Sequence, residues 1–118
     1  MENILLIIAD FSLRQLYHEL LFSEYCEVVP VAKVANAIVI ESLFDFRTVV
    51  LYPDDVAPTE IDAFLRLQRK IKRFARARIV LLTSDHDLYA RRLNATDTIL
   101  DINELVPSEV IKRIKRHR

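Results

Sequence analysis

The sequence contains no glycine, although it is 118 residues long. Glycine-rich phosphate loops and dinucleotide-binding turns need backbone positions that only glycine occupies at little cost. We therefore do not expect the chain to bind nucleotides through either device. An independent metabolic enzyme is also disfavoured, because the sequence offers no recognisable pair of nucleophile and base. The chain is predicted not to be an enzyme.

Cysteine and histidine are also scarce. A single cysteine, Cys26, excludes an internal disulfide and a cysteine-based zinc cluster. The three histidines, His18, His86 and His117, are scattered and form no ligand set, so neither a metal nor another cofactor is expected. No apolar run approaches the roughly 18 residues of a membrane span, and no basic segment precedes the first run. We expect a cytoplasmic protein with no membrane association.

The chain has no excess of either charge, with 17 basic and 17 acidic residues, and net charge therefore indicates no particular partner. Basic residues are nevertheless concentrated in residues 66–78 and 112–118. They interleave with apolar residues, as the solvated face of an amphipathic helix does. Nucleic-acid binding through these helices is an alternative, but aromatic stacking platforms are missing from both stretches.

Short apolar runs are the main feature that the sequence does contain. They cover residues 4–8, 49–51, 79–82 and 99–100. Runs of this length are typical of buried parallel strands. Each run is followed by acidic or hydroxylic residues, among them Asp10, Asp54, Thr83 and Asp101, and none of these four runs ends at a Lys, Arg or His.

The runs alternate with segments of helical periodicity. Strands are expected at Asn3–Ala9, Glu27–Ala32, Thr48–Tyr52, Arg78–Leu82 and Thr98–Leu100. Helices are expected at about 13–21, Ala35–Leu43, from Pro58 to Phe74, Asp87–Leu93, and from Pro107. Residues 1–118 thus form one α/β domain of three layers, a flavodoxin-like (βα)5 fold with a parallel five-stranded sheet. Pro30 cannot donate to a ladder, which places its strand at an edge and favours the strand order 2-1-3-4-5.

Helix starts can be assigned from capping residues. Ser12 is a plausible N-cap of the first helix. Thr59 and Asp62, three residues apart, resemble a capping box at the start of the third helix. At the carboxyl ends of the strands, the order 2-1-3-4-5 brings Asp10, the segment 52–54 and Thr83 into one crevice.

These residues carry a resemblance to the receiver domains of bacterial response regulators, which covers nearly the whole chain. The matching segments are Ile7–Arg14, Ala57-Pro58, Asp62–Phe64, Thr83-Ser84 and Ala95–Leu100. The resemblance implies a site with an acidic pair that helps to hold Mg²⁺ and an aspartate that accepts a phosphoryl group. It also implies a hydroxyl that hydrogen-bonds the phosphoryl group and a lysine that neutralises its charge.

This chain departs from that pattern at several positions. The acidic pair has become Ala9-Asp10, so one carboxylate is missing. The position of the lysine falls on Asp101, or on the neighbouring Ile102. Like charges then face one another without a cation, which opposes the addition of a phosphoryl group.

The position of the phosphoacceptor has two interpretations. Strand register places Tyr52 there, because residues 49–51 are its apolar lead-in. Loop counting places Asp54 there, because Pro58 follows four residues later as in the family. We favour Tyr52, and in that register no phosphorylatable aspartate is present.

The resulting hypothesis is a pseudo-receiver that acts in signal transduction through protein–protein contacts. Its degenerate pocket comprises Asp10, Tyr52, Asp54, Thr83 and Asp101. By resemblance, its partner-binding face carries Arg91, Arg92, Asp97, Glu104, Lys112 and Lys115, which contact a signalling protein or a second copy of the chain. The alternative is a working single-domain receiver that uses Asp54, in which case Mg²⁺ is required and Asp10 and Asp54 are weak candidates for binding it.

Overall fold

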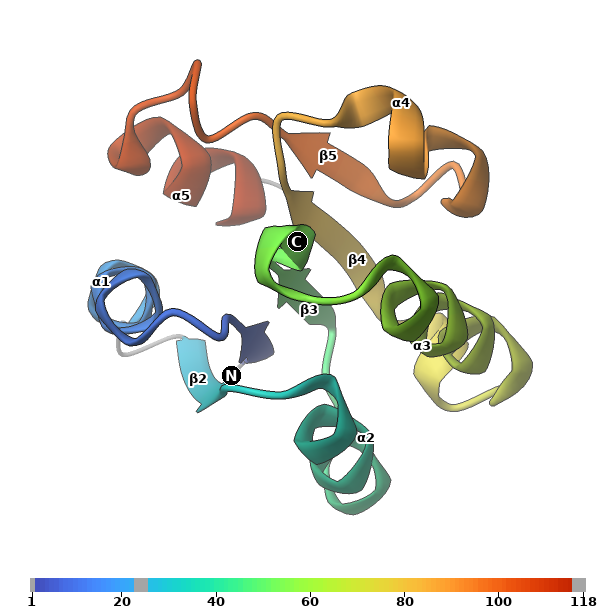
Figure 1. Ribbon diagram of the computed structural model, residues 1–118. Helices are drawn as coiled ribbons and strands as arrows, with labels where there is room; N and C mark the ends of the chain where they lie inside the picture. Colours follow the sequence, from blue (N-terminus) through green and yellow to red (C-terminus); the bar gives the residue numbers. More distant parts are fainter. Residues whose placement is uncertain (1, 23–25, 116–118) are drawn as a thin grey trace.

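The computed structural model describes residues 2–22 and 26–115, which form one five-stranded parallel sheet between two layers of helices (Figure 1). The strands are β1 (Glu2–Ile7), β2 (Cys26–Val31), β3 (Thr48–Leu51), β4 (Arg78–Leu82) and β5 (Thr98–Leu100). Their order is β2-β1-β3-β4-β5, which confirms the predicted fold class and topology. Pro30 lies on the edge strand β2, as its missing N–H group requires.

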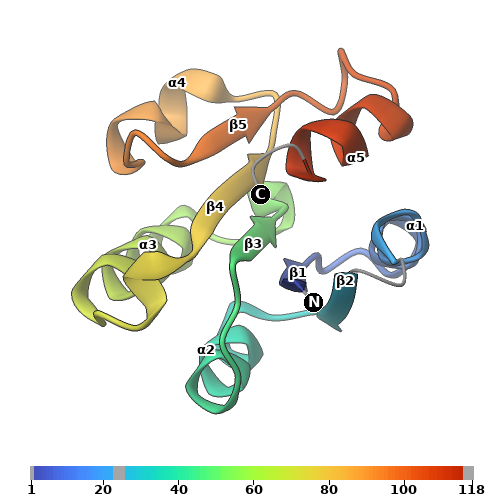
Figure 2. The ribbon, with the colours of Figure 1, turned by 180° about the vertical axis from the view of Figure 1, so that it is seen from behind.

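The helices connect successive strands. They are α1 (Phe11–Leu21), α2 (Val34–Leu43), α3 (Pro58–Lys70), α4 (His86–Tyr89) and α5 (Pro107–Lys115). Three short 3₁₀ turns are added, η1 (Pro53–Asp55), η2 (Phe74–Arg76) and η3 (Ala90–Arg92). Helices α1 and α5 cover one face of the sheet, and α2, α3 and α4 cover the other, as the front and back views show (Figures 1 and 2).

The core consists of two apolar layers, one on each face of the sheet. Alternate strand residues point to opposite faces, so Leu5 and Val49 pack under α2 and α3 while Leu6 and Val50 pack under α1 and α5. Because both faces are covered, the strands are apolar throughout. No helix in residues 2–22 or 26–115 is long and apolar enough to cross a bilayer.

The helix starts differ from the predicted caps. Asp10, and not Ser12, caps α1, since its Oδ1 accepts a hydrogen bond of 2.8 Å from the N–H of Leu13. Helix α3 has Ala57 at its N-cap and Pro58 at its first position, with no side-chain cap and hence no capping box. The predicted fourth helix is divided into α4, which Asp85 caps, and η3.

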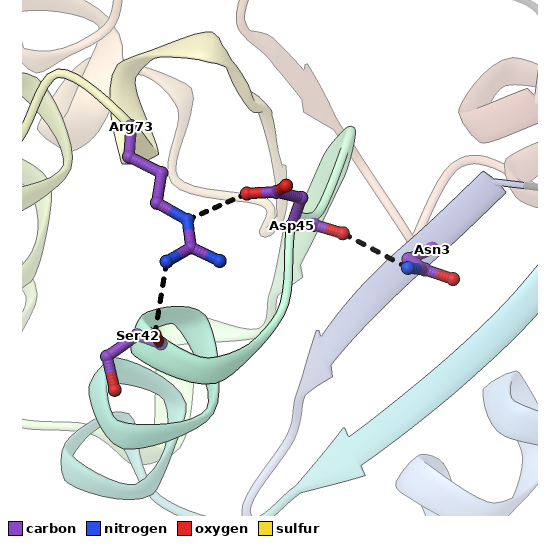
Figure 3. Close-up of polar contacts among 4 residues, drawn as sticks. All are labelled: Asn3, Ser42, Asp45 and Arg73. Atoms are coloured by element: carbon purple, nitrogen blue, oxygen red, sulfur yellow. Dashed lines mark hydrogen bonds and ion pairs between the residues drawn. The ribbon is translucent and has the colours of Figure 1, made fainter.

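A polar network connects segments at the amino ends of the strands, which we call the amino edge of the sheet (Figure 3). The Nε of Arg73 donates to Oδ1 of Asp45 at 2.7 Å, and its Nη1 donates to the carbonyl of Ser42 at 3.1 Å. The amide of Asn3 donates to the carbonyl of Asp45, also at 3.1 Å. The end of α2, the start of β1 and the segment after α3 are thereby joined.

Candidate functional site

A side-chain hydrogen bond joins the segments that follow β3 and β4. The Oγ1 of Thr83, which is buried, donates to Oδ1 of Asp54 at 2.8 Å. The same hydroxyl oxygen accepts a hydrogen bond of 3.1 Å from the N–H of Asp85. Asp54 lies in η1, so the 3₁₀ turn that begins at Pro53 is what carries its carboxylate toward β4.

Tyr52 lies on the other side of β3, at the α1 face of the sheet. It is half-buried, packs against the apolar layer under α1 and α5, and lines a hollow of about 440 Å³ together with Asp10 and Asp55. Burial raises the pKa of the Tyr52 hydroxyl, and the charges of Asp54, Asp55 and Asp10 raise it further. Tyr52 is therefore close to three carboxylates.

The two candidate phosphoacceptor residues have different neighbours. The contact to Thr83 is made by Asp54, which is the residue that loop counting selects. Tyr52, which we favoured, shares its hollow with Asp10. Both residues follow β3 closely, but the turn at Pro53 lies between them, and the side chain of Asp54 contacts Thr83 while that of Tyr52 lines the hollow beside Asp10.

Asp101 has a local role in the turn after β5. Its Oδ1 accepts a hydrogen bond of 2.9 Å from the N–H of Asn103, and its carbonyl accepts one of 3.0 Å from the N–H of Leu105. These contacts tie Asp101 to the loop that precedes α5. Asp101 is also not among the charges that raise the pKa of Tyr52.

Two basic residues close to the strand ends were missed by the sequence reasoning. The Nη1 of Arg14 donates to the carbonyls of Ile8 and Ala9, at 2.8 and 3.1 Å, and its guanidinium lies over the ring of Phe11. The second basic residue, Lys33, lies just after β2, a strand whose apolar run is interrupted by Pro30. Arg14 lies at one helical turn from Asp10, and this spacing was the available signal.

Neither residue forms an ion pair with the acidic side chains. In the part of the chain that the structure describes, the carboxylates of Asp10, Asp54 and Asp55 have no ion-pair partner. Residues 2–22 and 26–115 also contain no group of three or more His, Cys, Asp or Glu side chains arranged to hold a metal. Asp10 also caps α1 through its Oδ1.

Two residues of the partner-binding face predicted by resemblance also have contacts within the domain. Arg92 forms an ion pair with Asp62 of α3, and the carboxylate of Asp97 accepts hydrogen bonds from the N–H groups of Ile79 and Asn94, both at 2.9 Å. These two residues stabilise the fold itself. The remaining residues of the predicted face, Arg91, Glu104, Lys112 and Lys115, are exposed or half-exposed.

Some of the basic residues considered for nucleic-acid binding form contacts within the domain. Arg73 is in the amino-edge network, and a guanidinium nitrogen of Arg78 donates to the carbonyl of Ile114. Burial lowers the pKa of Arg78, although the charges of Glu2 and Asp97 oppose this effect. The last basic residues, 116–118, lie outside the described part of the chain.

A concavity lies between α2 and α3, a feature that the sequence did not indicate. This groove, about 830 Å³ in volume, has a mainly apolar lining that includes Val34, Ile38, Phe64 and Leu67. Lys33 stands on its α2 side, and Asp55 and Glu60 stand on its α3 side. Alanines form much of the remaining wall, and their short side chains leave the space open.

Comparisons with known proteins agree with this architecture. No protein-family model matches the sequence, and no curated protein is similar to it. Among solved structures, the chemotaxis response regulator CheY4 of Vibrio cholerae superimposes with a TM-score of 0.79 at 18% identity, over 98% of both chains. A response regulator receiver protein from Sinorhizobium medicae gives a TM-score of 0.78 at 19% identity, over 98% of this chain and 92% of that one.

A third similar structure is the receiver domain of the sensor histidine kinase PA1611 from Pseudomonas aeruginosa. It gives a TM-score of 0.72 at 15% identity, covers 96% of both chains, and holds a magnesium ion in its active-site cleft. At these identities the likeness concerns the fold. The chain has the flavodoxin-like fold of response regulator receiver domains.

Proposed function

We propose that this chain is a receiver-like signalling module that acts by binding proteins, without phosphorylation of an aspartate. The fold supports a place in signalling, since the similar structures are signalling regulators. Binding, and not catalysis, is the activity that the residues support.

The observation that carries the proposal is the uncompensated negative charge at the carboxyl edge of the sheet. Asp10 and Asp55 share a hollow with Tyr52, and Asp54 follows it in the chain. No cation of the described residues forms an ion pair with these three carboxylates. A phosphoryl group would add about 1.5 to 2 further negative charges. Phosphoryl transfer depends on positioning and on neutralisation of charge, and this site lacks the neutralising group.

The second acid and the lysine implied by the resemblance are both absent from the site. Ala9 stands in place of one carboxylate, and Asp101, in place of the lysine, is held in its own turn. The PA1611 receiver domain holds magnesium in its cleft. In this chain, Asp10 and Asp54 would be the weak candidates for such an ion, and Asp10 already accepts a hydrogen bond as the cap of α1.

A signalling protein is the proposed partner. On the side of α4, β5 and α5, the exposed side chains of Arg91, Glu104 and Lys112 are free to contact it. Arg92 and Asp97 of the proposed face also contact residues of the same domain, and the side chain of Arg92 is 41% exposed.

A second candidate function, a phosphorylatable receiver, is favoured by one observation. Thr83 donates to Asp54, so a hydroxyl stands next to a carboxylate that could act as a nucleophile. In this candidate Asp54 accepts the phosphoryl group from a donor, Thr83 donates to a phosphoryl oxygen, and Mg²⁺ is required.

Intact-mass measurement after incubation with acetyl phosphate separates the two candidates. The purified chain is treated with and without Mg²⁺, beside the Asp54→Asn variant as the matched control. We expect no added phosphoryl group in any sample. A mass increase of one phosphoryl group that requires Mg²⁺ and disappears in Asp54→Asn would overturn the proposal and establish the second candidate.

A further inference from the structure

Helix α2 has an outward stripe without any charged side chain. Ala35, Val39, Ser42 and Leu43 follow helical spacing and are exposed, with Val39 at 59% and Leu43 at 64%. Within Val34–Leu43 the one charged residue is Glu41, which is turned inward and buried. Because surface helices ordinarily carry charged residues on their outer face, this stripe has the character of an interface.

The stripe adjoins the groove between α2 and α3. Gln68 of α3 donates a buried hydrogen bond to Glu41, which joins the two helices in their carboxyl-terminal halves. The groove lies toward their amino-terminal halves, where Val34, Ala35 and Ile38 line one wall. A small ligand in the groove would leave Val39 and Leu43 exposed, so a macromolecular occupant fits the whole surface better.

The charges at the two ends of α2 identify the occupant. Lys33 is the N-cap and forms no side-chain capping hydrogen bond, while Asp45 follows the carboxyl end. The helix dipole favours the opposite arrangement, with negative charge at the amino end and positive charge at the carboxyl end. Arg73 compensates Asp45 in part, but Lys33 has no ion-pair partner among the described residues.

We propose that α2 forms a two-fold symmetric interface with α2 of a second copy of this chain, the two helices packing antiparallel. This arrangement brings Leu43 and Phe44 of each copy beside Val34, at the groove of the other. It also brings Lys33 of each copy beside Asp45 of the other, so that each helix end receives the charge its dipole favours. An isologous interface requires a surface that is complementary to itself, and α2 with its groove meets that requirement.

The inference deepens the proposed function, on which it rests, by naming a partner and a surface other than the face of α4, β5 and α5. The proposed function and the proposed dimer can be disproved independently of each other. Labelling by acetyl phosphate tests the silent site and is independent of association, whereas the experiments below measure association and are independent of phosphorylation.

Analytical ultracentrifugation of the full chain over a wide concentration range tests the dimer. We expect a monomer–dimer equilibrium in which Leu43→Glu raises the dissociation constant by at least about tenfold, since the new carboxylate would be buried without a partner. Leu43 is exposed in the monomer, so circular dichroism should remain that of the wild type. Val106→Glu, at a residue 63% exposed directly before α5, is the matched control and should leave the dissociation constant unchanged.

A charge exchange tests the antiparallel arrangement. Lys33→Asp and Asp45→Lys should each weaken association by about two- to fivefold, and the double variant should recover most of the loss. A wild-type chain that stays monomeric at every concentration overturns the proposal and leaves α2 to a different protein. Dissociation by Val106→Glu but not by Leu43→Glu also overturns it, and a double variant weaker than either single one refutes the antiparallel pairing.

Discussion

The two edges of the sheet differ in whether their charged side chains are paired. At the amino edge, Arg73 is paired with Asp45 and also donates to the end of α2 (Figure 3). At the carboxyl edge, Asp10, Asp54 and Asp55 lie around Tyr52 without an ion-pair partner in the described residues. Both edges are formed by loops on the same strands, so the difference arises from the side chains that each loop supplies.

This difference indicates that the side chains of the amino edge contribute to the stability of the fold. Pairing and capping at the amino edge join elements that are distant in sequence, as a structural region should. Unpaired like charges at the carboxyl edge raise the free energy of the folded state. The experiments that follow measure how far the contrast extends.

The largest effect is expected at Glu41, which lies buried between α2 and α3. Burial raises the pKa of its carboxyl from 4.5 to about 7, although the hydrogen bond from Gln68 opposes this shift. Between these two pH values the folded protein keeps a proton that the unfolded chain has lost. Stability therefore falls as pH rises from 4.5 to about 7, and stays low above that range.

Replacing Glu41 by Gln removes this pH dependence. We expect Glu41→Gln to raise the free energy of unfolding near neutral pH by about 3 kcal/mol, and to differ little from the wild type at the acidic end. Urea unfolding across the range provides the measurement. An identical pH slope in both proteins would show that Glu41 is not the buried acid that controls stability.

A smaller effect is expected at Asp10, where the carboxyl edge has its own structural contribution. Asp10→Ala removes the hydrogen bond to the N–H of Leu13 and should cost about 1 kcal/mol. Asp10→Asn should cost little, since asparagine is an equally good N-cap. Thermal and urea unfolding measure both variants, and a loss in Asp10→Asn as large as in Asp10→Ala would show that the charge, and not the cap, matters.

The amino-edge ion pair should contribute less again. The side chains of Arg73 and Asp45 are 44% and 85% exposed, and exposed pairs are usually worth about 0.2 to 1 kcal/mol. A double-mutant cycle of Arg73→Ala and Asp45→Ala gives the coupling energy. It should decrease at high salt, and a value unaffected by salt would show that the coupling is not the electrostatic attraction of the exposed pair.

The sequence was sufficient for the architecture because the signals are local and repeated. Four apolar runs and the strand that contains Pro30, separated by segments of helical periodicity, define a parallel sheet, and Pro30 identifies the edge strand. Convergence of Asp10, Tyr52 and Asp54 at one edge follows from the topology, and the charges that raise the pKa of Tyr52 agree with it.

Features that depend on side-chain direction were not accessible in this way. The 3₁₀ turn at Pro53 directs Asp54 toward Thr83 and leaves Tyr52 at the α1 face, a difference on which strand register and loop counting disagree. Arg92 pairs with Asp62 across two helices, a contact with no signature in the sequence. Tyr89, the last residue of α4, is buried in the apolar layer under α2 and α3.

The smallest effect on stability is expected for Asp54→Asn. Asp54 is exposed, and the asparagine oxygen can still accept the hydrogen bond from Thr83, so stability should change by less than about 0.5 kcal/mol. The variant nevertheless tests the electrostatics of the crevice. Loss of the Asp54 charge should lower the pKa of Tyr52, which remains raised by burial and by the other acids.

Tyr89 serves as the internal control in an NMR titration of the tyrosine rings. Its pKa is also raised, first by burial and then by the charge of Asp54, whereas Asp10 does not contribute. Asp54→Asn should therefore lower the pKa of both tyrosines, and Asp10→Asn should lower that of Tyr52 alone. If Tyr52 responds to neither variant, the carboxylates are screened by solvent, and the charge that sets the carboxyl edge apart from the amino edge is too weak to oppose a phosphoryl group.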